Sequence, residues 1–122
     1  MWEKGLCLTN NPLVIQGEKK NLVFVHGDSL AVFRSVREKL LAGRHLLTHP
    51  LAGGWGPGVN LYRSVMVSIN EEELLSGDLA LVDRAISQAL RWEEDKGEVN
   101  IDAAVLSDMQ YMDFMLIKDF LE

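Results

Sequence analysis

The segment LVFVHGDSLAVFRSVREKLLAGRHLLT, residues 22–48, decides the predicted fold. Residues 22–26 are β-branched and apolar, as in a central strand that is covered on both faces. Across residues 29–41, apolar side chains recur at helical spacing, which predicts an amphipathic helix. Residues 45–48 then form a third short strand. A strand, a helix and a strand with such short connections predict a right-handed βαβ unit, in which the two strands are parallel.

Capping residues support the bounds of this helix and of a later one. Asp28 or Ser29 is suited to cap the N-terminus of the first helix, because a short oxygen-bearing side chain accepts the free amide hydrogens there. Gly43 is suited to the left-handed conformation that follows a helix. Asp78 is expected to cap a second helix, which carries an apolar stripe. The stripe comprises Leu79, Val82, Ala85, Ile86, Ala89 and Leu90.

Two further strands are predicted outside the βαβ unit. Residues 5–9, GLCLT, are typical of a short buried strand, and the turn-favouring Asn10, Asn11 and Pro12 end it. Pro12 is also suited to open a short helix. Apolar and polar side chains alternate across residues 62–70, which predicts a fourth strand with one less covered face.

The C-terminal segment, residues 101–121, has the length and propensity of a helix and is apolar on more than one face. One stripe comprises Val105, Met109, Met112, Leu116 and Phe120. A helix that is apolar over so wide an arc is expected to cover the sheet and to retain apolar surface for a second contact. We therefore expect core packing or a homodimer contact through this helix, with capture of a peptide as the alternative.

Length and composition predict one compact domain. The chain has 122 residues, of which 48% are hydrophobic and 25% are charged, and this is enough for a single core. We predict one α/β domain over residues 1–122 with three layers. It comprises a mainly parallel sheet of about four strands, flanking helices and a long C-terminal helix.

Charge and hydropathy exclude several classes of function. The formal net charge of −6 opposes binding to nucleic acid. The sequence has no run of about 18 consecutive apolar residues, which a membrane helix needs, and its N-terminus does not match a signal peptide. We expect a cytoplasmic protein with no membrane contact. Its single cysteine, Cys7, lies in an apolar strand and is expected to be structural.

The segment Leu46–Ser64, LLTHPLAGGWGPGVNLYRS, marks the predicted site. Four glycines lie within residues 53–58, and glycine lets a ligand approach main-chain amides closely. Ligands of open parallel sheets bind outside the carboxyl ends of the strands. The strands ending at Thr9, His26 and Thr48 all lead into polar residues, so these residues are expected to meet at one rim. Trp55 is either a flap over this site or a plug against the core.

The polar groups of this rim suit a small anion such as a carboxylate or a phosphate. Arg63 would pair with the anion, Asn10 and Asn11 would orient it, and His49 would donate a hydrogen bond. Structural roles are the alternative for all three residues: both asparagines are equally suited to bond their own turn, and a structural role stays open for His49. His26 ends an apolar strand and is expected to be structural.

Motifs for common cofactors are absent from the sequence. The run GGWGPG at 53–58 is not a dinucleotide fingerprint, because a strand rather than a helix follows it, and it contains no Gly-Lys-Ser/Thr. One cysteine and three dispersed histidines do not indicate a zinc site. We therefore expect no cofactor and no metal.

Separate motifs that occur in order resemble the GrdX family. They are TNNPLV at Thr9–Val14, the pair Val36-Arg37 in the predicted helix, LLTHPLAG at Leu46–Gly53 and YRS at Tyr62–Ser64. The resemblance extends over about the first 70 residues. In place of a Lys-Pro and a Glu-Thr-Pro in the family pattern, this chain has Gly56-Pro57 and Val59-Asn60-Leu61. The charged loop residues of that pattern are therefore not expected to act here.

The resemblance implies a cytoplasmic accessory protein without an assigned activity. The family consists of small proteins encoded beside components of glycine, sarcosine and betaine reductases in anaerobic bacteria. It thus implies a reductase subunit as a partner, and together with the rim it predicts a small anionic metabolite as the ligand. The predicted ligand-binding residues are Thr9, Asn10, Asn11, Thr48, His49, Gly53, Gly54, Tyr62 and Arg63.

The alternative function is a small enzyme of acyl or phosphoryl transfer. His49 would be its general base, and the glycine loop would supply donors to an oxyanion. Acetyl phosphate is the natural substrate to test, because the reductases in the family's setting produce it. The sequence shows no complete catalytic set, so binding and catalysis remain alternatives at this point.

Overall fold

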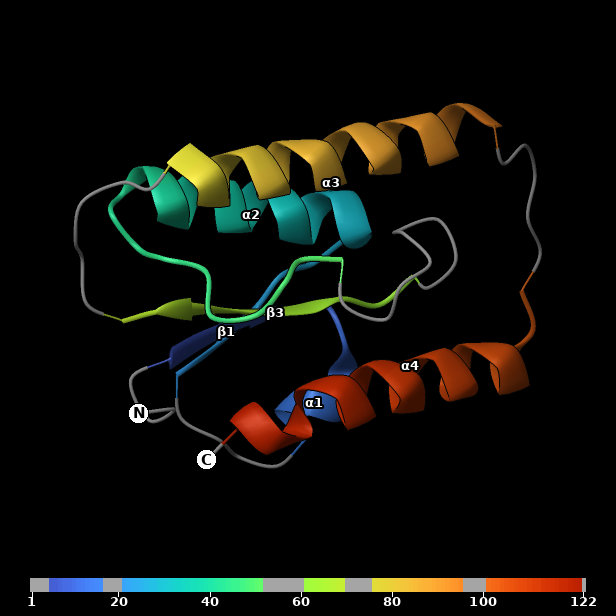
Figure 1. Cartoon of the computed structure of the whole chain (residues 1–122). Helices are drawn as coiled ribbons and strands as arrows, with labels where there is room; N and C mark the ends of the chain where they lie inside the picture. The colour runs from blue at the N-terminus through green and yellow to red at the C-terminus, as the bar shows by residue number, and fades with distance from the viewer. Residues whose placement is uncertain (1–4, 17–20, 52–60, 70–75, 96–100, 122) are drawn as a thin grey trace.

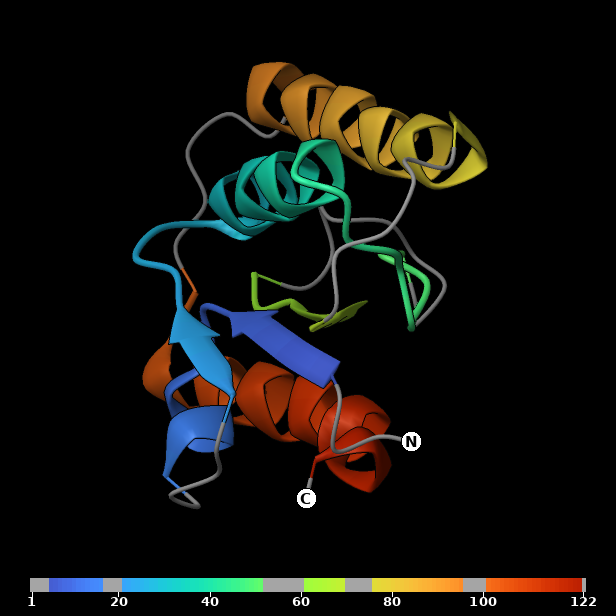
Figure 2. The ribbon, with the colours of Figure 1, turned by 90° about the vertical axis from the view of Figure 1, so that its left-hand side faces the viewer.

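The computed structural model describes residues 5–16, 21–51, 61–69, 76–95 and 101–121. Its elements are, in chain order, β1 (Gly5–Thr9), α1 (Pro12–Ile15), β2 (Leu22–Phe24), α2 (Ser29–Leu41), β3 (Ser64–Ser68), α3 (Ser76–Asp95), α4 (Ala103–Ile117) and a short 3-10 helix, Lys118–Phe120. Figures 1 and 2 show α2 and α3 on one face of the sheet, and α1 and α4 on the other. The predicted α/β class, the flanking helices and the C-terminal helix are confirmed.

The described residues form a mixed sheet of three strands in the order β2-β1-β3. The central strand β1 pairs in parallel with β2, with Thr9 opposite Phe24. On its other side β1 pairs antiparallel with β3, with Thr9 opposite Ser64. Figure 2 shows the two parallel strands side by side. The prediction of a mainly parallel sheet of about four strands is therefore wrong.

Residues 45–48 follow the outer edge of β3 without forming the predicted strand. They make one isolated antiparallel bridge to β3, and the Leu47 amide donates to the Met66 carbonyl at 2.8 Å. The Met66 amide then donates to Thr48 Oγ1, a side-chain oxygen, at 3.0 Å. Because the Thr48 hydroxyl takes the place of a main-chain carbonyl as acceptor, the regular main-chain hydrogen bonding between this segment and β3 ends at Thr48.

The same residues nevertheless run in the direction of β1 and β2, because they are antiparallel to β3, which is antiparallel to β1. The predicted βαβ unit thus joins two segments of equal direction at opposite edges of the sheet. The carboxyl ends of β1, β2 and this edge segment therefore lie at the same end of the sheet as the start of β3. We call this end, marked by Thr9, Phe24, Thr48 and Ser64, the rim.

The main core lies between the sheet and the helices α2 and α3. Alternate strand residues face it, and both helices present apolar residues at helical spacing. The buried members are Leu8, Val65 and Val67 from the sheet, Val32, Phe33, Val36 and Leu40 from α2, and Val82, Ala85 and Ala89 from α3. The opposite strand face carries Thr9 and Ser64 at the rim, and Cys7 and Met66 farther along the strands.

A smaller apolar cluster lies on the opposite face, against α4. It contains Cys7, Val14, Met66 and Ile117. Burial, with a smaller contribution from the charge of Asp113, raises the pKa of the Cys7 thiol to about 12. The thiol is therefore protonated at neutral pH and packs as a small apolar group, which agrees with its predicted structural role.

Side chains at the helix starts follow the predicted capping in part. Asp28 caps α2 by accepting the Ala31 amide at 3.0 Å, and Gly43 follows the helix with a φ of 102°. The predicted cap at Asp78 is wrong, because α3 begins at Ser76 and Asp78 lies in its first turn. Its carboxylate instead accepts the main-chain amide of Leu46 at 2.9 Å, since that amide at the sheet edge needs an acceptor.

The predicted apolar stripe is largely exposed along α4, and only Phe120, beyond the end of the helix, packs against the smaller cluster. Met112 is 61% exposed and Leu116 is 50% exposed, whereas the buried positions of α4 are Asp113 and Ile117. The spacing of apolar residues does not predict which side of α4 is buried, because the helix is apolar on nearly every side. We infer that the buried Asp113 determines the rotation of the helix about its axis. No described helix combines the length and the apolar character that crossing a membrane requires.

Replacing Phe33 by alanine should lower the free energy of unfolding by about 3–5 kcal/mol, because it leaves a cavity in the main core. Leu41 on the same helix is 53% exposed, so Leu41→Ala is the matched control and should change stability by about 0.5 kcal/mol or less. Urea denaturation measures both variants. Equal decreases in the free energy of unfolding for Phe33→Ala and Leu41→Ala would contradict the placement of Phe33 in the main core.

Candidate functional site

The rim brings together residues that are far apart in the sequence. The Arg63 amide donates to Asn10 Oδ1 at 2.8 Å, and the Asn10 amide donates to the Arg63 carbonyl at 3.3 Å. Asn10 Nδ2 also donates to the carbonyls of Gly27 and Leu61, at 3.0 and 2.9 Å. The side chain of Asn10 thus fixes the start of β3 and the position of Arg63. The predicted residues Gly53, Gly54 and Trp55 lie outside the described residues.

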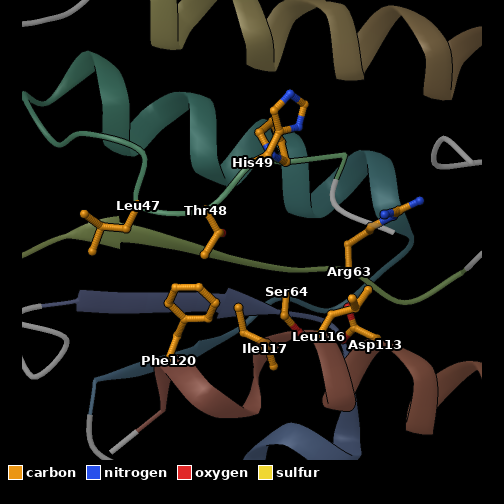
Figure 3. Close-up of a pocket in the computed structure, with 10 residues that line it drawn as sticks. Leu47, Thr48, His49, Arg63, Ser64, Asp113, Leu116, Ile117 and Phe120 are labelled. Carbon is orange, nitrogen blue, oxygen red and sulfur yellow. Dashed lines mark hydrogen bonds between the residues drawn. The ribbon is translucent and has the colours of Figure 1, made fainter. Parts of the chain in front are cut away.

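A cavity of about 270 Å³ lies between the rim and α4. Its walls come from residues 47–50, from the start of β3 and from the C-terminal part of α4 with the turn that follows it. Figure 3 shows these three segments around the cavity. Among the predicted site residues, those that line it are Thr48, His49 and Arg63.

Asp113 is a buried acid on α4 that holds this helix against the sheet. Its Oδ2 atom accepts the Ser64 hydroxyl at 2.6 Å and the side-chain amide of Asn11 at 3.0 Å. The same amide donates to the Gln110 carbonyl of α4 at 2.9 Å. A buried carboxylate is costly in free energy unless donors surround it. These contacts therefore fix both the place and the rotation of α4.

Hydroxyl groups extend this network across the sheet. The main-chain amide of Asn11 donates to Thr9 Oγ1 at 3.0 Å, and Thr9 Oγ1 lies 2.7 Å from Ser64 Oγ. When Asp113 is ionised, Ser64 must donate to the carboxylate, so Thr9 in turn donates to Ser64. Hydrogen bonds between side-chain oxygens therefore link Thr9, Ser64 and Asp113, and so join β1, β3 and α4.

Two residues of opposite charge, Arg63 and Asp113, line this part of the cavity. Burial raises the pKa of Asp113, while hydrogen bonds from Ser64 and Asn11 and the charge of Arg63 lower it in part. Burial lowers the pKa of Arg63, and the charge of Asp113 raises it in part. Burial is the larger cause for both groups, so neither charge fully offsets the desolvation of the other.

His49 lies at the lip of the cavity and is exposed. Its Nδ1 atom accepts the Leu51 amide at 3.0 Å, so the proton of the neutral ring lies on Nε2. In Figure 3 the imidazole points away from Ser64 and Asp113. His49 therefore offers an exposed donor rather than a base directed at the floor of the cavity.

The remaining predicted residues support the walls. Asn11 Oδ1 caps α1 by accepting the Leu13 amide at 3.0 Å. Because Asn11 Nδ2 donates to Asp113, both the oxygen and the nitrogen of this side-chain amide are hydrogen-bonded within the protein. The Tyr62 hydroxyl accepts a hydrogen bond from Gln110 Nε2 at 3.0 Å, which adds a second link between the start of β3 and α4. Thr9 is fully buried and contacts Ser64 rather than the cavity.

Sequence reasoning missed the wall that α4 contributes. The missed residues are Asp113, Leu116, Ile117 and the following Phe120. A signal was present in YMDFMLI, residues 111–117, where one acid interrupts an apolar run. A lone acid on such a helix indicates either a solvated position or a buried one with dedicated donors, and only the fold distinguishes the two.

Replacing Asp113 by asparagine should raise the free energy of unfolding near neutral pH. Because the pKa of Asp113 is above its ordinary value of 3.8 in the folded state, protonated Asp113 stabilises the fold below that value. This stabilisation is lost as the pH rises through the folded-state pKa. The amide oxygen of asparagine still accepts from Ser64 and Asn11.

Urea denaturation of both proteins, at about pH 3 and about pH 7, measures this effect. The increase in the free energy of unfolding of Asp113→Asn over the unchanged chain should be present at about pH 7 and smaller at about pH 3. Arg63 and Cys7 are the charged and titratable groups that interact with Asp113, and both are unchanged in the comparison. If Asp113→Asn is less stable than the unchanged chain at about pH 7, the account of Asp113 as a buried acid whose ionisation destabilises the fold is wrong.

Comparison with known proteins gives one match. No curated protein and no solved structure matches the chain. The family described as GrdX-like protein matches residues 6–122. The match includes the resembling motifs of the N-terminal half and also α4 with Asp113. The chain therefore belongs to the GrdX-like protein family.

Proposed function

We propose that the protein binds a small anionic metabolite in the cavity between the rim and α4. The observation that carries this proposal is Arg63, which is 5% exposed and lines the cavity. Arg63 brings a guanidinium to the wall of the cavity, where burial lowers its pKa and the charge of Asp113 raises it in part. An anion in the cavity beside Arg63 would add a further opposite charge.

Two donors at the mouth of the cavity support the same ligand class. The Thr48 oxygen accepts the Met66 amide, which leaves the hydroxyl proton to be donated elsewhere. The Nε2 atom of His49 carries the ring proton because Nδ1 is engaged by Leu51. A guanidinium with a hydroxyl and an imidazole N–H nearby suits a carboxylate or a phosphate.

The contact between His49 and Leu51 favours binding over general-base catalysis. A general base needs a free lone pair within reach of the proton that it removes. In the neutral ring that lone pair is on Nδ1, which already accepts an amide at 3.0 Å. We therefore propose a binding protein and no reaction at His49.

We further propose that this binding serves glycine, sarcosine or betaine reductase systems, with the protein as a cytoplasmic accessory. Membership of the GrdX-like family supports this setting. A reductase subunit as partner and a homodimer through α4 remain predictions.

Removing the positive charge of Arg63 should weaken the binding of small anions about 10- to 100-fold, as expected for loss of a charge-assisted hydrogen-bond pair. Acetate, phosphate and acetyl phosphate are the probes, and isothermal calorimetry on Arg63→Gln and the unchanged chain is the measurement. Arg37→Gln is the matched control, because Arg37 lies on α2 and pairs with the exposed Asp83 at 2.8 Å. The control should bind as the unchanged chain does.

A second variant separates binding from folding. Arg63→Lys keeps the charge without the bidentate geometry and should retain an intermediate affinity. A thermal-shift assay verifies that each variant is folded, and saturating anion should raise the melting temperature of the unchanged chain. Failure of these three anions and of longer monocarboxylates to bind at millimolar concentration would overturn the proposed function.

A further inference from the structure

The cavity is polar at one end and apolar at the other. In Figure 3, Arg63, Ser64 and Asp113 gather at one end, while Leu47 and Phe120 lie at the opposite end. All five residues line the same cavity. The ligand therefore meets charge at one end and hydrocarbon at the other.

We infer that the ligand is a monocarboxylate with an aliphatic body of several carbons, rather than a bare inorganic anion. This inference rests on the proposed function and specifies the chemical class of its ligand. The carboxylate lies at the Arg63 end of the cavity, and the aliphatic body extends toward Phe120.

The apolar end retains surface that a ligand would cover. Leu47 and Phe120, which lie at this end, are only partly buried against the smaller cluster. An inorganic anion at Arg63 would leave these side chains in contact with water. An aliphatic chain would remove them from water, with a gain in affinity of about fourfold for each methylene group that is buried.

The volume indicates a small ligand. A cavity of about 270 Å³ compares with roughly 30 Å³ per water molecule in the liquid, which corresponds to about nine non-hydrogen atoms. A carboxylate of about six carbons has eight such atoms and fits within it.

The charges determine the head group. Arg63 supplies a positive charge at the polar end, and a second carboxylate at the other end would lie against Leu47 and Phe120 without a donor. Asp113 lies at the same polar end, and its Oδ2 atom accepts two hydrogen bonds from the protein. The proposed carboxylate pairs with Arg63, and an apolar body suits the other end.

A homologous series from acetate to octanoate tests the inference by isothermal calorimetry with the full chain. Affinity should rise about fourfold per methylene up to about six carbons and then level off or fall. Pentylammonium, which keeps an aliphatic body but reverses the charge, should not bind at comparable concentration. Equal affinity along the series, or equal binding of the ammonium, would overturn the inference.

Two variants locate the aliphatic body. Leu47→Ala should reduce the increase in affinity per methylene, because Leu47 lines the cavity at the Phe120 end, and a thermal-shift assay verifies that the variant is folded. Leu90→Ala is the control, since Leu90 is 41% exposed and lies on α3 across the sheet. An unchanged increase per methylene in Leu47→Ala, or equal reductions in both variants, would contradict the placement of the aliphatic body at this end.

The same data distinguish the two proposals. If acetate and phosphate bind through Arg63 and chain length has no effect, the proposed function holds and the ligand class is wrong. If no member of the series binds and the inorganic anion does not bind either, the proposed function itself fails. If long members bind equally well to Arg63→Gln, they bind elsewhere on the apolar surface, and the inferred site is wrong.

Discussion

The structure depends on compensating one buried carboxylate. Asp113 is the acid that α4 turns toward the sheet, and its oxygen is held by Ser64 of β3 and by Asn11 at the start of α1. Because α4 is apolar on nearly every side, hydrophobic burial alone would allow several rotations of this helix. The hydrogen bonds of Asp113 select one of them. That rotation places Leu116, Ile117 and the following Phe120 along the cavity.

Local signals in the sequence predicted the elements and missed their arrangement. The strand at 5–9, the helix opened by Pro12 and the helix capped by Asp28 all follow from propensity and capping within a few residues. The direction of β3 and the order of the strands depend on contacts between distant residues. The contact of Thr48 Oγ1 with the Met66 amide is an example, since nothing near Thr48 in the sequence indicates it.

The structure brings together part of the predicted rim and adds a wall from α4. Asn10 and Arg63 do meet at the rim, because the carboxyl end of β1 adjoins the start of β3. Thr48 and His49 line the same cavity as Arg63. Asp113 was missed because an acid in a helix is usually solvated, and its burial follows only from the way α4 packs on the sheet. Asn11 caps the local helix α1, as in the structural alternative, whereas Asn10 bonds the distant backbone of Gly27, Leu61 and Arg63.

Amide hydrogen exchange in Ser64→Ala tests most directly whether the Asp113 network positions α4. The account predicts faster exchange of the amides of Phe114, Met115 and Ile117, because Asp113 loses a donor that joins α4 to β3. The amides of α3, which pack on the other face of the sheet, should exchange as before. Unchanged protection of α4, or an equal increase in both helices, would contradict the account.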